Sequence, residues 1–366
     1  MTQLLTHSRI QSFKACRRRN WFEYQVGLRQ QVDGRALRMG SAYHLGLEQL
    51  GNGRPLEVAL DSVESCYAVV PNTCDTLDWN YERVTVLTLL RGYQWRWEQS
   101  AITHIETELS FRLPLINPET DRPTPLFDLA GKIDGIVKLE DNRLAVSEQK
   151  TLSDPLDSDA ELWRRLRIDH QITMYVLAAR RLGYSVACVL YDVTRKPTIQ
   201  PTAVPVLDSD GMKVVLDETG ARVLTAQKKP RQTGDTAKGY VLQTEPMTPD
   251  QWGEKLLADI YARPEYYFAR NEIPRLDSDL REYEYELWSI QQTIREADKT
   301  GRWYRTCSRD TCKYCPYFNL CTTGYNPESD PCPEGFVFVD NVHPELEETT
   351  SGYATEANDA RLAAAQ

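Results

Sequence analysis

The stretch FDLAGKIDGIVKLEDNRLAVSEQKT, residues 127–151, decides the fold that we expect for this chain. Its two halves, 127–139 and 143–150, alternate apolar and polar residues and are rich in β-branched side chains, which is typical of strands. Glu140, Asp141 and Asn142 are residue types that favour a turn between them. The stretch therefore predicts a β-hairpin centred on Asp141.

A hairpin centred there brings three charged side chains together. Asp134 and Glu148 are equally far from Asp141, so they are expected to lie opposite each other on adjacent strands. Lys150 follows Glu148 by two residues and points to the same face. Two close carboxylates repel each other, so one of them takes up a proton unless a cation neutralises the pair.

A hard divalent ion such as Mg²⁺ or Mn²⁺ provides that neutralisation. Such an ion binds a phosphate oxygen, lowers the pKa of a bound water and supports attack on phosphorus. The lysine would orient the water or stabilise the charge that grows on the phosphate. The pattern thus indicates metal-dependent hydrolysis of a phosphodiester.

An ordinary surface hairpin with a Glu–Lys ion pair is the alternative explanation. Neighbouring positions on both strands are apolar, which predicts burial: Ile133, Ile136, Val137, Leu144 and Val146. Buried strands rarely carry charged side chains that they do not use. The setting of the three charged residues therefore favours a functional site.

Blocks of helix and strand surround the hairpin. Apolar residues at helical spacing, the first set capped by Ser8, predict helices at about 8–16, 37–50, 55–68, 81–101, 159–182, 248–262 and 278–298. Further strands are expected at 104–113 and 186–194. This order predicts an α/β fold with a central mixed sheet flanked by helices.

Charge is distributed unevenly along the chain. The net charge is −10, but residues 326–366 carry nine acidic residues and one basic residue, while residues 1–50 are basic. The acidic segment is also rich in Pro, Glu and Ser, which predicts disorder. We expect a folded domain over residues 1–325, with an excursion or subdomain at about 196–247, and a disordered acidic tail at 326–366.

Location and redox state bear on the nine cysteines. No run of 18 apolar residues predicts a membrane span, and MTQLLTHSRIQSF does not resemble a secretory signal, so a cytoplasmic location is expected. The cytosol is reducing, which argues against a disulfide framework. Cys312, Cys315 and Cys321 fall within ten residues and favour a metal or cluster site, with Cys16 or Cys307 as candidates for the fourth ligand.

A histidine lies upstream on one of the predicted helices. His44 and Glu48 are four residues apart and share a helix face, and Gly40, Ser41 and Ala42 would let that helix approach another backbone closely. A lone histidine on a helix is more often a structural residue than a ligand. The residues alone therefore leave the role of His44 open.

Six segments, in this order over residues 8–325, resemble the RecB-like branch of the PD-(D/E)XK nuclease superfamily. They are SRIQSFKACRRRNWFEY, GSAYHLGLE, GKIDGI, SEQKT, DHQITMYVLAAR and CKYCPYFNLC. The resemblance is greatest to the iron–sulfur nucleases similar to the C-terminal nuclease of AddB, the CRISPR adaptation nucleases and phage exonucleases. It implies a restriction-endonuclease-like core that is closed by an iron–sulfur cluster joining the N- and C-terminal segments.

The resemblance also implies roles for particular residues. His44, Asp134, Glu148 and the backbone carbonyl of Gln149 would bind the catalytic metal, and Lys150 would be the catalytic lysine. Gln171 and Tyr175 would contact DNA or brace the site. The ligands of a 4Fe–4S cluster would be Cys16, Cys312, Cys315 and Cys321. Glu48 has no firm role in that pattern, and Cys307 is left over.

The function implied is a Mg²⁺- or Mn²⁺-dependent DNA exonuclease in recombination, repair or phage DNA processing. Its partners would be single- or double-stranded DNA ends and proteins of recombination or CRISPR adaptation. A catalytically idle iron–sulfur subunit that binds DNA or a partner protein is the first alternative. A zinc-stapled protein without nuclease activity is the second, although zinc sites usually show two close pairs of ligands.

Overall fold

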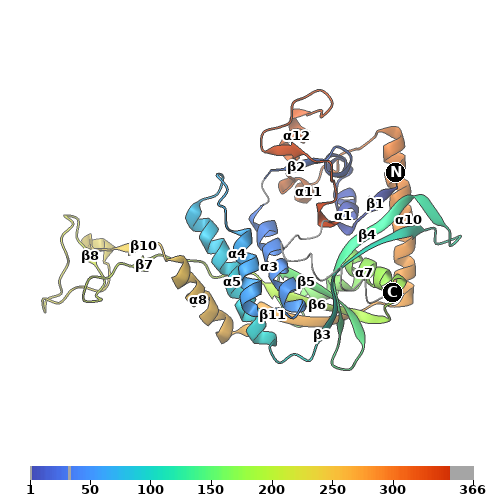
Figure 1. Ribbon diagram of the computed structural model, residues 1–366. Coiled ribbons are helices and arrows are strands. Elements are labelled where there is room, and N and C mark those ends of the chain that lie inside the picture. The colour runs from blue at the N-terminus through green and yellow to red at the C-terminus, as the bar shows by residue number, and fades with distance from the viewer. Residues whose placement is uncertain (1, 32–33, 347–366) are drawn as a thin grey trace.

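The computed structural model describes residues 2–31 and 34–346. Its centre is a six-stranded sheet in the order β1–β4–β5–β6–β11, with β3 paired to β4 (Figure 1). The strands are β1 (Gln3–Leu5), β3 (Thr103–Ile116), β4 (Pro123–Lys138), β5 (Leu144–Leu152), β6 (Val186–Arg195) and β11 (Phe268–Pro274). Strand β1 is parallel to β4 and β5 is parallel to β6, while the other pairs are antiparallel. The predicted mixed sheet is confirmed.

The hairpin formed by β4 and β5 turns where the sequence predicts. Its turn is closed by hydrogen bonds from the Leu139 N–H to the Arg143 carbonyl at 2.9 Å and from the Asn142 N–H to the Leu139 carbonyl at 3.0 Å. Asn142 has a φ of 69°, in the left-handed region that asparagine tolerates better than most residues. The turn fixes the register in which β4 and β5 pair, and thereby the relative positions of their side chains.

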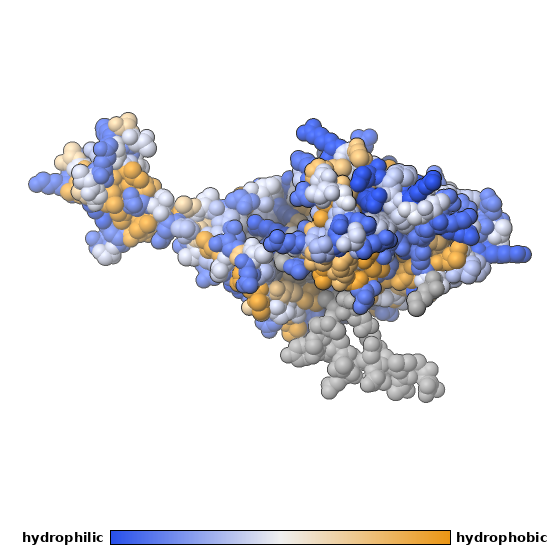
Figure 2. Space-filling model, turned by 90° about the horizontal axis from the view of Figure 1, so that it is seen from above, coloured by the Kyte–Doolittle hydropathy of each residue, from blue (hydrophilic) through white to orange (hydrophobic). Residues whose placement is uncertain are grey.

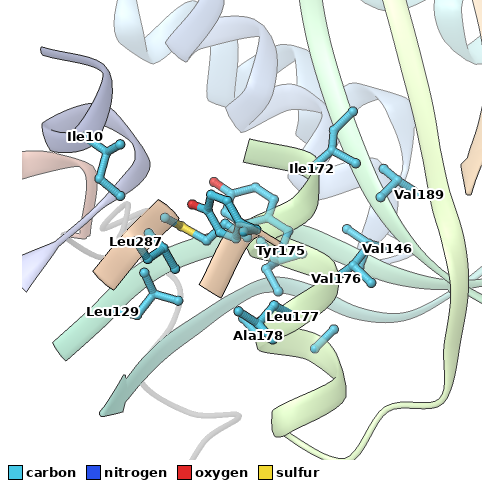
Figure 3. Packing of buried hydrophobic residues seen from close by; sticks show 14 of the residues in the cluster. Ile10, Leu129, Val146, Ile172, Tyr175, Val176, Leu177, Ala178, Val189 and Leu287 are labelled. Atoms are coloured by element: carbon cyan, nitrogen blue, oxygen red, sulfur yellow. The ribbon is translucent and has the colours of Figure 1, made fainter. Parts of the chain in front are cut away.

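Two groups of helices flank the sheet. The first comprises α1 (His7–Ala15), α7 (His170–Arg181) and α10 (Asp277–Thr300). Figure 3 shows Val176 of α7 beside Val146 of β5, and both belong with Tyr175 and Val189 to one apolar core. The second group comprises α3 (Arg35–Gly51), α4 (Leu56–Cys66), α5 (Thr76–Trp97) and α8 (Pro249–Ala262). These helices share a separate core around Tyr43, Leu90 and Trp252.

A glycine sets the separation of α3 and α5. A Cβ added to Gly46 would lie 2.5 Å from a terminal methyl of the Leu90 side chain, so Leu90 would have to move to make room for an alanine there. Gly40, one of the residues expected to permit a close approach, leaves room for a Cβ, which would lie 3.6 Å from the Thr151 hydroxyl. The close approach therefore occurs at Gly46, one helical turn and a half further along.

The expected helix at 159–182 is broken into three pieces. They are α6 (Glu161–Arg165), the 3-10 turn η2 (Leu166–Ile168) and α7. Asp169 has extended backbone, and its side chain accepts a hydrogen bond from the Ile172 N–H at 3.0 Å. An N-cap aspartate starts a new helix in this way. The sequence predicts one continuous helix here because helix-forming residues lie on both sides of Asp169. Similarly, Thr6 rather than Ser8 caps α1.

Residues 196–247 form an arm that extends away from the rest of the molecule, at the left of Figure 1. It holds β7 (Val204–Pro205), β8 (Val215–Leu216), η3 (Thr236–Lys238), β9 (Val241–Leu242) and β10 (Thr244–Glu245). Pairs β7–β10 and β8–β9 are antiparallel. Apolar surface is visible on the arm in Figure 2, and its exposed apolar side chains include Leu207, Leu224 and Val241.

Part of the segment expected to be disordered is structured. Strand β12 (Phe336–Phe338) pairs antiparallel with β2 (Leu28–Gln30), and the Val339 N–H donates to the Gly27 carbonyl at 2.8 Å. The prediction of disorder from residue 326 is therefore wrong up to 346, because a short apolar run is embedded in a polar composition. The rest of the predicted tail, 347–366, lies outside the described residues.

The remaining elements are short. They are α2 (Arg17–Asn20), η1 (Trp21–Gln25), α9 (Pro264–Tyr267), α11 (Arg309–Lys313), α12 (Phe318–Thr323) and η4 (Pro344–Leu346). Over the described part of the chain, no helix combines the length and apolar character needed to cross a membrane.

Candidate active site

The candidate site lies where β5 separates from β4. The last paired residues of the hairpin are Gly135 and Ser147, and β1 pairs with β4 further along the same edge, at Phe127 to Leu129. Asp134 and Glu148 occupy the next positions on the two strands. The Gln149 N–H donates to Asp134 Oδ2 at 2.7 Å, which holds the Asp134 side chain against β5.

Glu148 is completely buried. The Lys150 ammonium contacts its Oε1, but neither carboxylate oxygen has a well-oriented hydrogen-bond partner among the described residues. Burial raises the pKa of Glu148 to about 8, as does the nearby Asp134, although Lys150 opposes this. A buried carboxylate left in this state costs free energy, and a bound cation would remove that cost.

Lys150 has the complementary environment. Burial alone would lower the pKa of its ammonium, but the carboxylates of Glu148 and Asp134 raise it above its usual value. Lys150 therefore stays charged beside the pair of carboxylates, which is the arrangement that the spacing Glu-x-Lys predicts.

His44 reaches this site from α3. Its Nδ1 lies 3.8 Å from Asp134 Oδ2. Burial lowers the pKa of the imidazole, and Lys150 lowers it further, against the effect of Asp134. The ring is therefore neutral at physiological pH, which is the form that binds metals.

The donors fit a divalent cation in kind. Carboxylates and a neutral imidazole are ligands that Mn²⁺ and, less readily, Mg²⁺ accept. Within the described ranges, however, no three His, Cys, Asp or Glu side chains are close enough to form a ready-made metal group. The binding of one ion by His44, Asp134 and Glu148 therefore remains a prediction. The same holds for the Gln149 carbonyl, whose residue is placed beside Asp134 by its N–H.

Helix α7 supplies the other two predicted residues. Gln171 Nε2 donates to the Tyr175 hydroxyl at 3.1 Å, and the Tyr175 ring meets Phe111 edge-on at 6.2 Å between centroids. Burial raises the pKa of Tyr175, and the negative charge of Glu148 raises it further. Tyr175 is therefore close enough to Glu148 for the charge of its carboxylate to act on it, and the roles of Gln171 and Tyr175 in binding DNA or bracing the site remain predictions.

Several neighbours of this site were not singled out in the sequence. Asp169 raises the pKa of both Glu148 and His7, while burial and the nearby Lys150 bring the pKa of His7 down to about 4. Across β3 and β4, Glu108 pairs with Lys132, and burial raises the pKa of Glu108 to about 7. Glu108 also has a φ of 52°, an uncommon backbone conformation that is often found at functional sites.

These neighbours differ in how well the sequence could have revealed them. Asp169 opens the segment DHQIT and could have been recognised as a helix cap. Glu108 gave no comparable signal, because it lies within a regular strand pattern. Glu48, weighed as a supporting residue, is half-buried, and burial raises its pKa against the effect of Lys132.

The predicted cysteine ligands meet at a second place, between the ends of the chain. The Thr306 N–H donates to Cys16 Sγ at 3.4 Å, and Cys312 Sγ donates to the Thr306 carbonyl at 3.9 Å. Burial raises the pKa values of Cys315 and Cys321, and Cys16 contributes to both shifts. These four thiols are therefore neighbours although about 300 residues separate Cys16 from the others.

The surroundings of the thiols suit a cluster of thiolates. Cys315 and Cys321 pack against an apolar core formed by Phe22, Leu28 and Tyr317. Positive charge lies close by, because Arg19 lowers the pKa of Cys315 and Arg305 lowers that of Cys321. Cys307 is exposed. The described thiols do not form a ready-made metal group as they stand, and the cluster remains a prediction.

The comparisons with known proteins agree with this geometry at the level of the family. The model of the PD-(D/E)XK nuclease superfamily matches residues 4–322. None of the curated proteins matches the sequence significantly. Among solved structures, the chain is similar to a candidate exonuclease from Eubacterium rectale, with 9% identity and a TM-score of 0.34 over 76% of this chain and 87% of that chain. A TM-score this low carries no argument, so the family assignment rests on the family model.

Proposed function

Since the chain belongs to the PD-(D/E)XK nuclease superfamily, we propose that it is a Mg²⁺- or Mn²⁺-dependent DNA exonuclease. The observation that supports this most strongly is the position of Asp134 and Glu148 directly beyond Gly135 and Ser147, the last pair of the β4–β5 ladder, with Lys150 against Glu148. We further propose that it belongs to the RecB-like iron–sulfur branch and acts in recombination, repair or phage DNA processing.

The residues would divide the chemistry as follows. Asp134, Glu148, His44 and the Gln149 carbonyl would hold the divalent ion. Once bound, that ion supplies an activated water and charge neutralisation at the phosphate. Lys150, which stays charged beside Glu148, would stabilise the negative charge that develops on the phosphate oxygens.

Gln171 and Tyr175 would position the strand beside that centre. Their mutual hydrogen bond fixes the orientation of both side chains. A fixed orientation matters because small displacements of a substrate cost large factors in rate. These two residues would therefore act on the placement of DNA and leave the proton transfers to others.

We also propose that Cys16, Cys312, Cys315 and Cys321 hold a 4Fe–4S cluster that joins the two ends of the domain. Its support is the meeting of these thiols near arginine side chains. The role would be that of a structural cross-link, since it would close a loop of about 300 residues.

A time course on end-labelled DNA tests the proposal. Single- and double-stranded substrates would be incubated with purified protein and Mg²⁺, Mn²⁺ or a chelator. We expect metal-dependent release of short products from an end. Binding without hydrolysis in either metal would instead indicate the idle DNA-binding subunit. Absorbance near 400 nm with bound iron supports the cluster, whereas a colourless protein with stoichiometric zinc contradicts it.

A further inference from the structure

A cavity of about 370 Å³ lies outside the site described above. Its walls come from the start of α3, from α5 and α8, and from the ends of β5 and β6 where the arm begins. The residues that matter for its chemistry are Arg35, Ser153, Lys196, Tyr81 and Trp252. Figure 1 shows that α3, α5 and α8 lie on the same side of the molecule as the root of the arm.

The cavity is joined to the candidate active site by two continuous elements. Helix α3 carries Arg35 at its start and His44 further along, so about 14 Å of helix separates their backbones at 1.5 Å per residue. Strand β5 carries Lys150, and Ser153 follows three residues later, about 10 Å away. The Lys196 N–H donates to the Leu152 carbonyl at 2.7 Å, which holds the end of β6 to the end of β5.

Over the described residues that line this cavity, the charged side chains are the cations Arg35 and Lys196. The buried carboxylate of Glu82 is the nearby acid, and Arg38 contacts both of its oxygens, at 3.2 and 2.9 Å. Arg35 lies further from the same carboxylate, at 3.6 Å. Lys196 has no acidic partner within the described part of the chain, and burial and the neighbouring Arg35 lower its pKa. Among the residues that the structure describes, two cations thus border the cavity, and the nearby carboxylate of Glu82 is already paired with Arg38.

The rest of the lining suits the other parts of a nucleotide. Tyr81, Met39, Pro197 and Trp252 provide apolar and aromatic surface, and Ser153 provides a hydroxyl. Apolar walls with a few polar groups are typical of small-molecule sites. The volume is sufficient for one nucleotide, whereas a protein side chain would leave much of it empty.

We propose that this cavity is a subsite for one nucleotide of the DNA strand, with Arg35 and Lys196 binding its phosphate. That the bound strand is DNA rests on the nuclease function proposed above. At 10–14 Å from the catalytic residues, and with about 3.4 Å of axial rise per nucleotide in one strand, the subsite takes a nucleotide roughly three or four positions from the bond that is cut.

Equilibrium binding of a fluorescent single-stranded oligonucleotide tests the subsite without hydrolysis. Anisotropy would be measured in chelator for the parent protein and for Lys196→Glu and Arg35→Ala, over a range of salt concentrations. We expect ~10-fold weaker binding for Lys196→Glu, since hydrogen bonds to charged groups contribute that much. The slope of log affinity against log salt should fall by about one for each lost phosphate contact.

Two controls make the outcome specific. Lys299→Glu changes the charge equally at an exposed position on α10 and should bind like the parent. With oligonucleotides of two to eight nucleotides, the affinities of the parent and Lys196→Glu should differ only at lengths above about four nucleotides. Equal binding by Lys196→Glu and the parent at all lengths overturns the subsite, as does an equal loss in Lys299→Glu.

Hydrolysis of DNA by the same proteins is measured separately from binding. If the parent binds oligonucleotide through Lys196 but hydrolyses no DNA in Mg²⁺ or Mn²⁺, the subsite stands and the nuclease proposal fails. If the parent hydrolyses DNA and Lys196→Glu binds normally, the nuclease proposal stands and the subsite fails.

Discussion

The candidate active site and the cysteine site are built in opposite ways. Asp134, Glu148 and Lys150 project from two long strands of the central sheet, whose hydrogen-bonded register determines which side chains meet. The cysteines project from helices of five and six residues and from the connecting segments between them. The first site obtains its geometry from the sheet, while the second lies where segments from the two ends of the chain meet, beside the pairing of β2 with β12.

The two sites also differ in burial: the strand site is more deeply buried than the cysteine site. Glu148 is fully buried, and the large apolar core next to it offsets the free-energy cost of burying its carboxylate. Cys312, Cys315 and Cys321 are only half-buried, next to a core of three buried residues. Changes at the strand site should therefore affect activity without unfolding the protein, and changes at the cysteine site should do the reverse.

The largest expected effect is on activity at the strand site. Lys150→Ala and Asp134→Ala should each reduce metal-dependent hydrolysis by about 10³-fold or more, a loss typical of removing an electrostatic stabiliser. The melting temperature and any iron content should stay near those of the parent. End-labelled DNA assays with calorimetry check both points. Asp141→Ala, at the exposed tip of the same hairpin, is the matched control, and activity in Lys150→Ala equal to that of Asp141→Ala would remove the catalytic assignment.

The next effect is on stability at the cysteine site. Cys16→Ser should release the iron and lower the free energy of unfolding by about 5 kcal/mol, the chain-entropy value for a cross-link over so long a loop. Iron content, absorbance near 400 nm and chemical denaturation measure this. Cys307→Ser is the control and should keep its iron. The reverse result, with iron lost only in Cys307→Ser, would assign the fourth ligand to Cys307.

The same contrast explains what the sequence could predict. Strand alternation and turn residues specify a register, so Asp134 and Glu148 could be placed opposite each other before any coordinates were known. Asp169 and Glu108 could not, because tertiary contacts bring them near Glu148 and Lys132. Strand β12 was missed because its stability depends on pairing with β2, some 300 residues away in the chain, and a local polar composition says nothing of that partner.

A third experiment compares the metal dependence of the two sites. Adding Mn²⁺ at 100 times its dissociation constant should stabilise the parent by about 2.7 kcal/mol through mass action. Glu148→Gln should lose most of that stabilisation, because the amide cannot neutralise the ion. Thermal unfolding with Mn²⁺ and with chelator checks this. The absorbance of the cluster should not respond to Mn²⁺, and an equal thermal response in Glu148→Gln would remove Glu148 from the metal ligands.

The smallest expected effect is on stability at Asp169, where two variants distinguish its role as a helix cap from the effect of its charge. This residue caps α7, which carries Gln171 and Tyr175, and its charge also acts on Glu148. Asp169→Ala removes both contributions, whereas Asp169→Ser keeps a capping oxygen and removes the charge. Losing the cap should cost about 1 kcal/mol, so Asp169→Ala should unfold more readily than Asp169→Ser by that amount in denaturant titrations. Equal stability of the two variants would mean that Asp169 acts through its charge, and α7 would then be held in place by its apolar face alone.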